Sequence, residues 1–240
     1  MIISHQHRFI FVKTRKTAGT SIEVLLGAIA GDDAVVTPVD PPVKGHVARN
    51  YKLPSRATRA LVWRARRRVR GTNNPAYFNH ISLRGIRTQL GARRADSYFT
   101  FCFERNPWEK TVSGFFFATG RGEFDGTFRD YVLGSDLPSD FDKYSLDGET
   151  VSVDFVGRYE QLEDDLRLAL DRIGLQQHPV SLTREKGNFR PADARAEALY
   201  DEEMSARIEA VFAREIRAFG YTRPANLGVG PATDAAPGSG

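Results

Sequence analysis

The 240-residue sequence has a single cysteine, Cys102, and no long apolar run. One cysteine excludes an intrachain disulfide and a cysteine-rich metal site. Its place in the apolar segment YFTFCFE indicates a buried thiol. The lack of about 18 consecutive apolar residues excludes an ordinary membrane-spanning helix. Residues 1–12 lack the apolar core and cleavage site of a signal peptide, so we expect a cytoplasmic protein.

The composition is that of an ordinary globular protein, with 41% hydrophobic and 27% charged residues. The length suits one α/β domain, which we place at residues 1–223. Residues 224–240 are rich in proline, glycine and alanine and are predicted to be a disordered tail. The net charge of +4 favours acidic partners, and leaves nucleotides, nucleic acids and acidic glycans open.

Strands and helices alternate along the sequence. Near-continuous apolar segments predict strands in HRFIFVK (7–13), SYFTFCFE (97–104) and VSVDFVGRYE (151–160). Helical spacing predicts helices over 19–30, 79–91, 107–120, 162–174 and 200–219, and the prolines in 31–45 predict a loop. This order predicts an α/β fold with a central parallel sheet flanked by helices. Ligands of such sheets bind beyond the carboxyl ends of the strands, where polar loops follow Val12 and Phe103.

The segment FVKTRKTAGTSIE joins the first predicted strand to a helix through a basic loop rich in hydroxyl groups. A helix N-terminus presents free backbone N–H groups to an anion. The segment therefore predicts a P-loop-like strand-loop-helix phosphate site, with backbone and side-chain donors from Lys13, Arg15, Lys16, Thr17, Ala18, Gly19, Thr20 and Ser21. It is not a Walker A sequence, because Lys16 precedes Gly19. The alternative is an ordinary turn with solvated lysines.

A second polar motif, FERNPWEKTVS, follows the strand over 97–104. Arg105 ends that strand, and Ser113 falls in the second turn of the next helix, so both can bind one phosphate. Asn106 is the expected N-cap and Pro107 the first helical residue. The alternative pairs Arg105 with Glu104 or Glu109.

These two motifs resemble those of sulfotransferases that use 3′-phosphoadenosine 5′-phosphosulfate (PAPS). FVKTRKTAGTS is similar to their 5′-phosphosulfate loop and RNPWEKTVS to their 3′-phosphate motif, and the resemblance is to the carbohydrate-type branch in its bacterial cytosolic form. It runs from about residue 1 to residue 221 and is weak over 31–75. Arg15 stands where proline is common in the family loop.

The resemblance implies transfer of a sulfuryl group from PAPS to an acceptor hydroxyl by in-line displacement, with a carbohydrate as acceptor. Lys16 would be the catalytic lysine and His80 the base; the alternative base is His46, with Glu23 and Glu104 as fallbacks. Arg105 and Ser113 would bind the 3′-phosphate, Tyr159 would lie near the adenine, and Lys186 would close over the 3′-phosphate. No metal is expected, because the sequence has no metal-ligand spacing and basic side chains supply the charge.

Three other functions remain open. An ATP-using P-loop kinase would use the same loop, although the Walker A order is missing. The arginine run over 64–70 has three interpretations. It is first a solvated helix face, as charge runs usually are, and second a site for an anionic acceptor. A basic nucleic-acid-binding module ranks last. A protein that binds 3′,5′-adenosine diphosphate (PAP) without turnover is a third alternative. The acceptor and the oligomeric state are not predicted.

Overall fold

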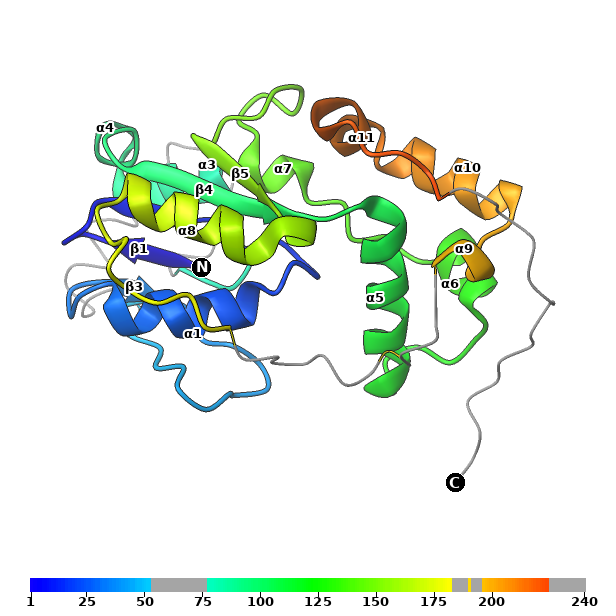
Figure 1. Ribbon diagram of the computed structural model, residues 1–240, viewed down its shortest axis with the longest axis horizontal. Helices are drawn as coiled ribbons and strands as arrows, with labels where there is room; N and C mark the ends of the chain where they lie inside the picture. Colours follow the sequence, from blue (N-terminus) through cyan, green and yellow to red (C-terminus); the bar gives the residue numbers. More distant parts are fainter. Residues whose placement is uncertain (53–76, 183–189, 191–195, 225–240) are drawn as a thin grey trace, which may run out of the picture. The chain divides into compact units, whose positions relative to one another are not determined.

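The computed structural model describes residues 1–52, 77–182, 190 and 196–224 (Figure 1). The chain divides into two compact units: unit 1 comprises Met1–Phe103 and Asp142–Glu185, and unit 2 comprises Glu104–Phe141 and Lys186–Gly240. The predicted arginine run over 64–70, Lys186 and the predicted tail from 225 onward lie outside the described residues.

The described part of unit 1 contains a mixed five-stranded sheet in the order β3-β1-β2-β4-β5. β2 and β4 run parallel, with Phe9 opposite Phe99 and Phe11 opposite Phe101. β1 runs antiparallel to both β2 and β3. The strands are β1 (Ile2–Ser4), β2 (Phe9–Phe11), β3 (Val35–Val36), β4 (Phe99–Glu104, whose last residue belongs to unit 2) and β5 (Phe155–Arg158). The predicted α/β class is confirmed.

The predicted parallel arrangement holds at β2 and β4, whereas β1 and β3 are antiparallel and were not predicted as strands. Only four residues connect β1 to β2, which is enough for a hairpin but far too short for a parallel crossover. β3 lies inside the segment 31–45 that was predicted as a loop. Its Val36 N–H also donates to the Arg49 carbonyl oxygen at 2.9 Å, which adds an isolated antiparallel bridge.

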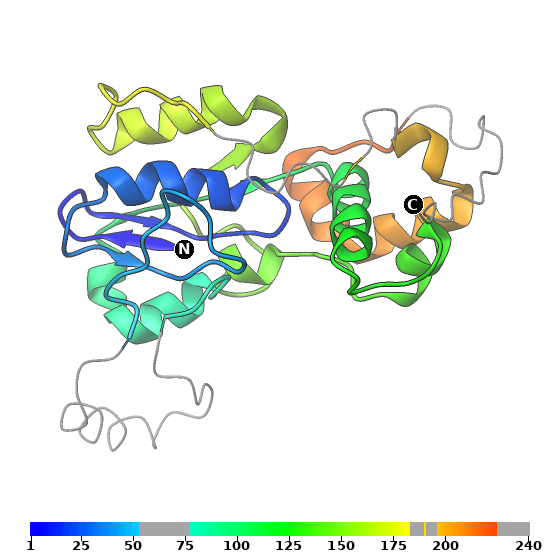
Figure 2. The same cartoon turned by 90° about the horizontal axis from the view of Figure 1, so that it is seen from below.

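Helices cover both faces of the unit 1 sheet. In Figure 2, α1 (Gly19–Ile29) and α8 (Leu162–Arg172) lie on one face, and α3 (Leu83–Leu90) and α4 (Ala92–Ala95) on the other. The core between the sheet and the first pair contains Phe9, Phe11, Phe101 and Phe103 from the strands, Ile22 and Leu26 from α1, and Leu166 and Leu170 from α8. The helices predicted over 19–30, 79–91 and 162–174 are therefore confirmed.

Unit 2 is helical in its described part (Figure 1). Its helices are α5 (Pro107–Gly120), α6 (Phe128–Gly134), α9 (Ala196–Leu199), α10 (Glu202–Val211) and α11 (Ala213–Phe219), and α7 (Phe141–Tyr144) begins at its boundary with unit 1. Trp108 is buried in their core and donates its indole N–H to Ser205 Oγ at 3.0 Å. Tyr200 donates its hydroxyl to the Trp108 carbonyl oxygen at 2.9 Å, which ties α5 to the C-terminal helices.

Helix caps explain where α5 and α10 begin. Asn106 accepts the N–H groups of Trp108 and Glu109 at 3.1 and 3.4 Å, and Pro107 is the first helical residue, as predicted. The single helix predicted over 200–219 is wrong. Asp201 caps α10 by accepting the Met204 N–H at 2.8 Å, and the chain leaves helical geometry at Phe212 (φ −104°, ψ 21°) before α11.

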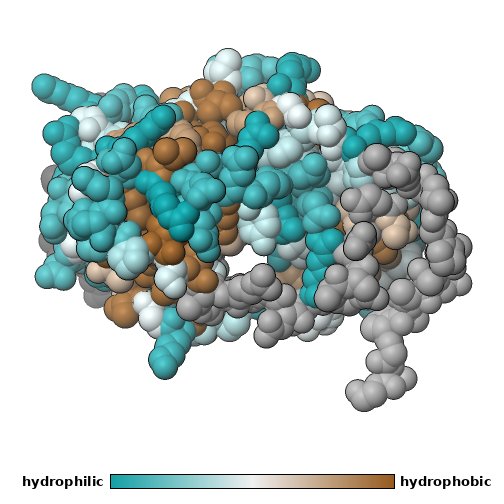
Figure 3. Space-filling model, in the orientation of Figure 1, coloured by the Kyte–Doolittle hydropathy of each residue, from teal (hydrophilic) through white to brown (hydrophobic). Residues whose placement is uncertain are grey.

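Among the described residues, few large apolar side chains are mostly exposed. The most exposed ones in the described ranges are Val47, Phe78 and Leu168, at 67%, 43% and 54%. Figure 3 shows apolar side chains on the face of unit 1 that is turned to the viewer. Within the described ranges, no helix combines the length and the apolar character needed to cross a bilayer.

Candidate functional site

The loop between β2 and α1 turns through two left-handed residues. Lys16 has φ 62° and Ala18 has φ 58° and ψ 20°. Such values cost roughly 1–3 kcal/mol in a residue with a Cβ atom and cluster at functional sites. Ala18 is also the N-cap of α1, and its methyl group cannot accept a hydrogen bond from the first turn. The loop therefore ends at a helix N-terminus that its own N-cap side chain leaves open.

Thr14 attaches this loop to the carboxyl end of β4. Its hydroxyl donates to the Phe103 carbonyl oxygen at 2.5 Å and lies 2.9 Å from the Thr17 hydroxyl. Both threonine side chains are buried. The Thr17 hydroxyl, predicted as a ligand donor, thus takes part in the internal bonding of the loop in this structure. The same bonds hold the loop beside the strand that leads to Arg105.

Lys13 is turned into the interior of unit 1. Its Nζ lies 2.5 Å from Glu23 Oε2 and 3.3 Å from the Thr20 hydroxyl, and the Lys13 and Glu23 side chains are 5% and 0% exposed. The Met1 amine contacts the same carboxylate. Burial lowers the pKa of Lys13 below its usual value, and Glu23 opposes this. Burial alone would raise the pKa of Glu23, but the amine and Lys13 hold it below its usual value.

Gly19 at the start of α1 makes room for Lys13. A Cβ atom at Gly19 would lie 2.8 Å from Lys13 Cγ, which is closer than real Cβ atoms approach, and 3.0 Å from Lys13 Cε. The lysine stem thus crosses the helix start on its way to Glu23. Gly19, which the sequence predicts as a backbone donor to a ligand, therefore has a packing role in this structure.

The remaining loop residues differ in their exposure. The Thr20 and Ser21 side chains are buried in the first turn of α1, whereas Arg15 and Lys16 are partly exposed. Arg15 and Lys16 are therefore accessible to a ligand from solution, whereas the Thr20 and Ser21 side chains are buried.

The two candidate histidines occupy different environments in unit 1. His80 Nδ1 lies 3.1 Å from the Lys13 carbonyl oxygen, which can only accept, so Nδ1 carries the proton and the neutral ring has its lone pair on Nε2. Lys143 donates to the His80 carbonyl oxygen at 3.2 Å. The His46 side chain is 3% exposed, with Nε2 at 4.0 Å from Glu23 Oε2. Burial lowers the pKa of His46, although Glu23 raises it.

Arg105 and Ser113 both belong to unit 2, near the start of α5. The Arg105 side chain is 10% exposed, and its Nη2 lies 3.2 Å from Glu109 Oε2. The sequence analysis gave this ion pair with Glu109 as the alternative to phosphate binding by Arg105. Ser113 is half-buried in the second turn of α5. The helix start places the arginine just before the first turn and the serine on the second, as the motif predicts.

Two further predicted residues can be placed. Tyr159 lies, partly exposed, in the short 3-10 helix η1 (Tyr159–Gln161) after β5. Glu104, a fallback base in the sequence analysis, is fully buried and contacts Lys110 at 3.0 Å. Within the ranges that the structure describes, no three histidine, cysteine or acidic side chains are grouped as metal ligands.

Sequence reasoning missed two features of unit 2. One is the contact of Arg190 with Glu109, and the other is the buried cluster of Lys110 with Glu104 and Asp140. Arg190 and Asp140 lie far from α5 in the sequence and carry no motif. Only the charge pattern of WEK after Pro107 marks these positions, and charge patterns do not identify partners.

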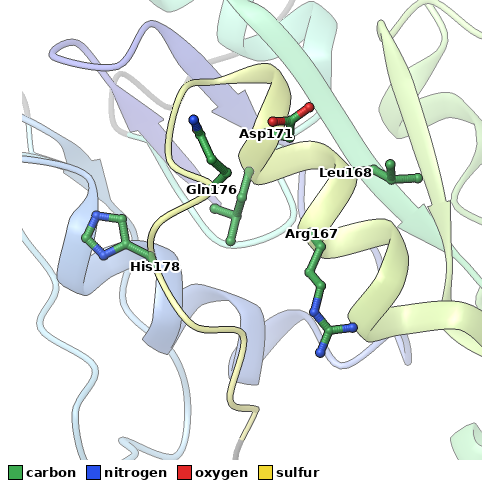
Figure 4. A pocket seen from close by; sticks show the side chains of 6 residues that line it. Arg167, Leu168, Asp171, Gln176 and His178 are labelled. Carbon is green, nitrogen blue, oxygen red and sulfur yellow. The ribbon is translucent and has the colours of Figure 1, made fainter.

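A separate pocket of about 270 Å³ lies along α8 (Figure 4). α8 contributes Arg167, Leu168, Leu170 and Asp171, and the segment after it contributes Gln176 and His178. The Arg167 guanidinium is held by its own helix, at 2.7 Å from Asp164 and 3.1 Å from Glu163. None of the residues predicted for the cofactor lines this pocket.

Comparisons with known proteins identify one relative by sequence. No protein-family model and no solved structure matches the chain. An uncharacterized protein of Archaeoglobus fulgidus is 38% identical over 95 residues, which are 38% of this chain and 79% of the archaeal protein. Identity at this level over most of a protein reflects common descent. The chain therefore belongs to the same family as this archaeal protein.

Proposed function

We propose that the protein is a sulfotransferase that moves the sulfuryl group of PAPS to an acceptor hydroxyl on a carbohydrate or a sugar-containing metabolite. The observation that carries the proposal is the basic loop that ends at the open N-terminus of α1. Thr14 fixes this loop to Phe103. Only Glu104 separates Phe103 from Arg105, so covalent geometry keeps the Cα atoms of Phe103 and Arg105 within about 7 Å of each other.

The loop and the RNPWEKTVS motif would hold different ends of PAPS. The backbone N–H groups of the first turn of α1 suit the 5′-phosphosulfate, because a helix N-terminus stabilises anions. Lys16, which is partly exposed, would bind the oxygen that leaves the sulfur. Arg105 and Ser113 would bind the 3′-phosphate that distinguishes PAPS from ATP, and Tyr159 would lie against the adenine.

The reaction needs one proton acceptor. The acceptor hydroxyl attacks sulfur, a new S–O bond forms, the S–O bond to the 5′-phosphate breaks, and 3′,5′-adenosine diphosphate (PAP) leaves. The hydroxyl proton passes to Nε2 of His80, which carries the lone pair when Nδ1–H donates to Lys13. His46 is the weaker candidate, because its side chain is 3% exposed and faces Glu23. Positioning and charge stabilisation supply most of the rate enhancement.

Thermal unfolding with PAP, ADP and ATP in parallel tests the proposal on wild type and Arg105→Ala. A ligand at 100 times its Kd adds about 2.7 kcal/mol of stability, which is roughly 5 to 10 °C in Tm for a chain of this size. We expect this shift with PAP, a small shift with ADP or ATP, and loss of the PAP shift in Arg105→Ala.

Arg129→Ala is the matched control, since Arg129 lies in unit 2 with a side chain 46% exposed and pairs with Asp201 and Glu203. It should keep the full PAP shift. An equal shift with ATP would favour the kinase alternative, and no shift with PAP would refute the sulfotransferase. A PAP shift without turnover on any hydroxyl acceptor would identify a binding protein instead.

A further inference from the structure

Two arginines of unit 2 bind one carboxylate. Arg105 Nη2 lies 3.2 Å from Glu109 Oε2, Arg190 Nη2 lies 3.3 Å from Glu109 Oε1, and Arg190 Nη1 contacts Oε2. The side chains of Arg105, Arg190 and Glu109 are 10%, 25% and 34% exposed. The two guanidinium groups therefore converge on one anion in a partly buried place.

Glu109 is negatively charged in this arrangement. Partial burial raises the pKa of its carboxyl, but the hydrogen bond and charge of Arg190, together with Arg105, hold that pKa below its usual value. The group of three side chains thus has a net charge of about +1 at neutral pH. Arginine binds carboxylate and phosphate with the same planar fork of N–H donors. A carboxylate held in this way occupies a position that suits a phosphate.

We propose that Arg190 is a second arginine of the 3′-phosphate site and that Glu109 competes with the phosphate for both guanidinium groups. The inference rests on the proposed function, since Arg105 is the residue assigned to the 3′-phosphate. A phosphate dianion that enters beside the Glu109 carboxylate meets a net charge of +1. When the partly exposed Glu109 side chain turns toward water, the same dianion meets a net charge of +2.

This competition has a consequence for turnover. Two arginines on one phosphate dianion favour slow release of PAP, because each charge-assisted contact raises affinity. A carboxylate that returns to the arginines lowers this affinity for PAP but not for ADP, which has no 3′-phosphate. Glu109 therefore favours release of the product.

Isothermal titration calorimetry with PAP, ADP and inorganic phosphate tests the proposal on the full chain. Glu109→Gln should bind PAP about tenfold more tightly than wild type, because a negative charge beside the phosphate is gone. Arg190→Gln should bind PAP about tenfold more weakly. ADP affinity should stay within about twofold of wild type in both variants, since neither residue meets its phosphates. Glu123→Gln and Arg121→Gln alter an exposed pair of unit 2 and should change nothing.

The outcomes separate the two proposals. If wild type binds PAP no better than ADP, the sulfotransferase proposal fails. The affinity for inorganic phosphate then tests whether Arg105 and Arg190 form an anion site, independently of that proposal. Tighter phosphate binding in Glu109→Gln supports that site. Unchanged or weaker binding of PAP and phosphate, in a Glu109→Gln variant that keeps the tryptophan fluorescence of wild type, overturns the competition. Unchanged PAP binding in Arg190→Gln removes Arg190 from the site.

Discussion

Replacing Glu104 with glutamine removes the proton-binding group of a buried charge cluster in unit 2. Lys110 Nζ lies 3.0 Å from Glu104 Oε2 and 3.2 Å from Asp140 Oδ2, and all three side chains are fully buried. Glu215 is buried as well, and its Oε1 accepts the Asp140 N–H at 3.2 Å. Lys110 thus interacts electrostatically with the carboxyl groups of Glu104, Asp140 and Glu215. Three buried carboxyl groups close together favour retention of a proton on one of them.

Glu104 is the group that keeps this proton. Burial raises its pKa to about 7, Lys110 opposes this, and Asp140 adds to it. The pKa of Lys110 is raised too, since the carboxylates outweigh the effect of its burial. The two shifts agree, because several carboxyl groups stabilise the ammonium of Lys110, while burial and the neighbouring carboxyl groups disfavour the charged form of Glu104.

The sign of the pH dependence follows from the proton count. Between the ordinary pKa of 4.5 and the folded value of about 7, the folded chain binds one more proton at Glu104 than the unfolded chain does. The free energy of unfolding therefore falls by about 1.4 kcal/mol per pH unit as pH rises through this window. Over the whole window the loss is about 3 kcal/mol. Glu104→Gln lacks this loss, because a glutamine amide does not release a proton over this pH range.

Urea unfolding from pH 4.5 to 8.5 measures this difference. Trp108 is buried in unit 2, so its fluorescence reports the unit that holds the cluster, once Trp63 is replaced by phenylalanine. The stability of wild type relative to Glu104→Gln should fall by about 3 kcal/mol from low to high pH. Glu123→Gln, at a side chain 52% exposed, is the control and should follow wild type. Parallel curves for wild type and Glu104→Gln would refute the reasoning.

Two predictions concern the loop of unit 1. Gly19→Ala should lower the free energy of unfolding by about 1–3 kcal/mol, because its Cβ would meet the Lys13 stem at 2.8 Å; Gly27→Ala in the same helix has its nearest neighbour at 4.0 Å and should be neutral or stabilising in the same urea titration. Equal effects at the two glycines would contradict the packing role. Thr14→Ala should cost about 1–2 kcal/mol by losing the bond to Phe103, and Thr14→Ser should restore most of it. A serine variant as unstable as the alanine variant would show that the hydroxyl bond is not the cause.

Local signals in the sequence were enough for most helices and for the central strands. Asn106 and Pro107 predict the start of α5, because a cap and a proline act within a few residues. The run FIF predicts β2 and FTFCFE predicts β4 for the same reason. These signals also place the basic loop and Arg105 after neighbouring strands.

Strand direction needed the tertiary structure. β1 has three residues and β3 has two, so neither carries a pattern long enough to identify a strand. β1 pairs with β2 across a connection of only four residues, whereas its pairing with β3 is a long-range contact that the tertiary structure decides. The break at Phe212 likewise follows from packing in the unit 2 core, since the apolar spacing continues through it.

The sequence by itself determined the composition class, the positions of the two polar motifs proposed to bind phosphate and the residue types that can bind an anion. The tertiary structure decided which of these side chains meet. Lys13 turns to Glu23, Thr14 to Phe103, and Arg105 with Arg190 to Glu109. Three of these four pairings join residues ten or more positions apart. A side chain meets such a partner only when the folded backbone brings the two within reach, and spacing along the chain does not encode that distance.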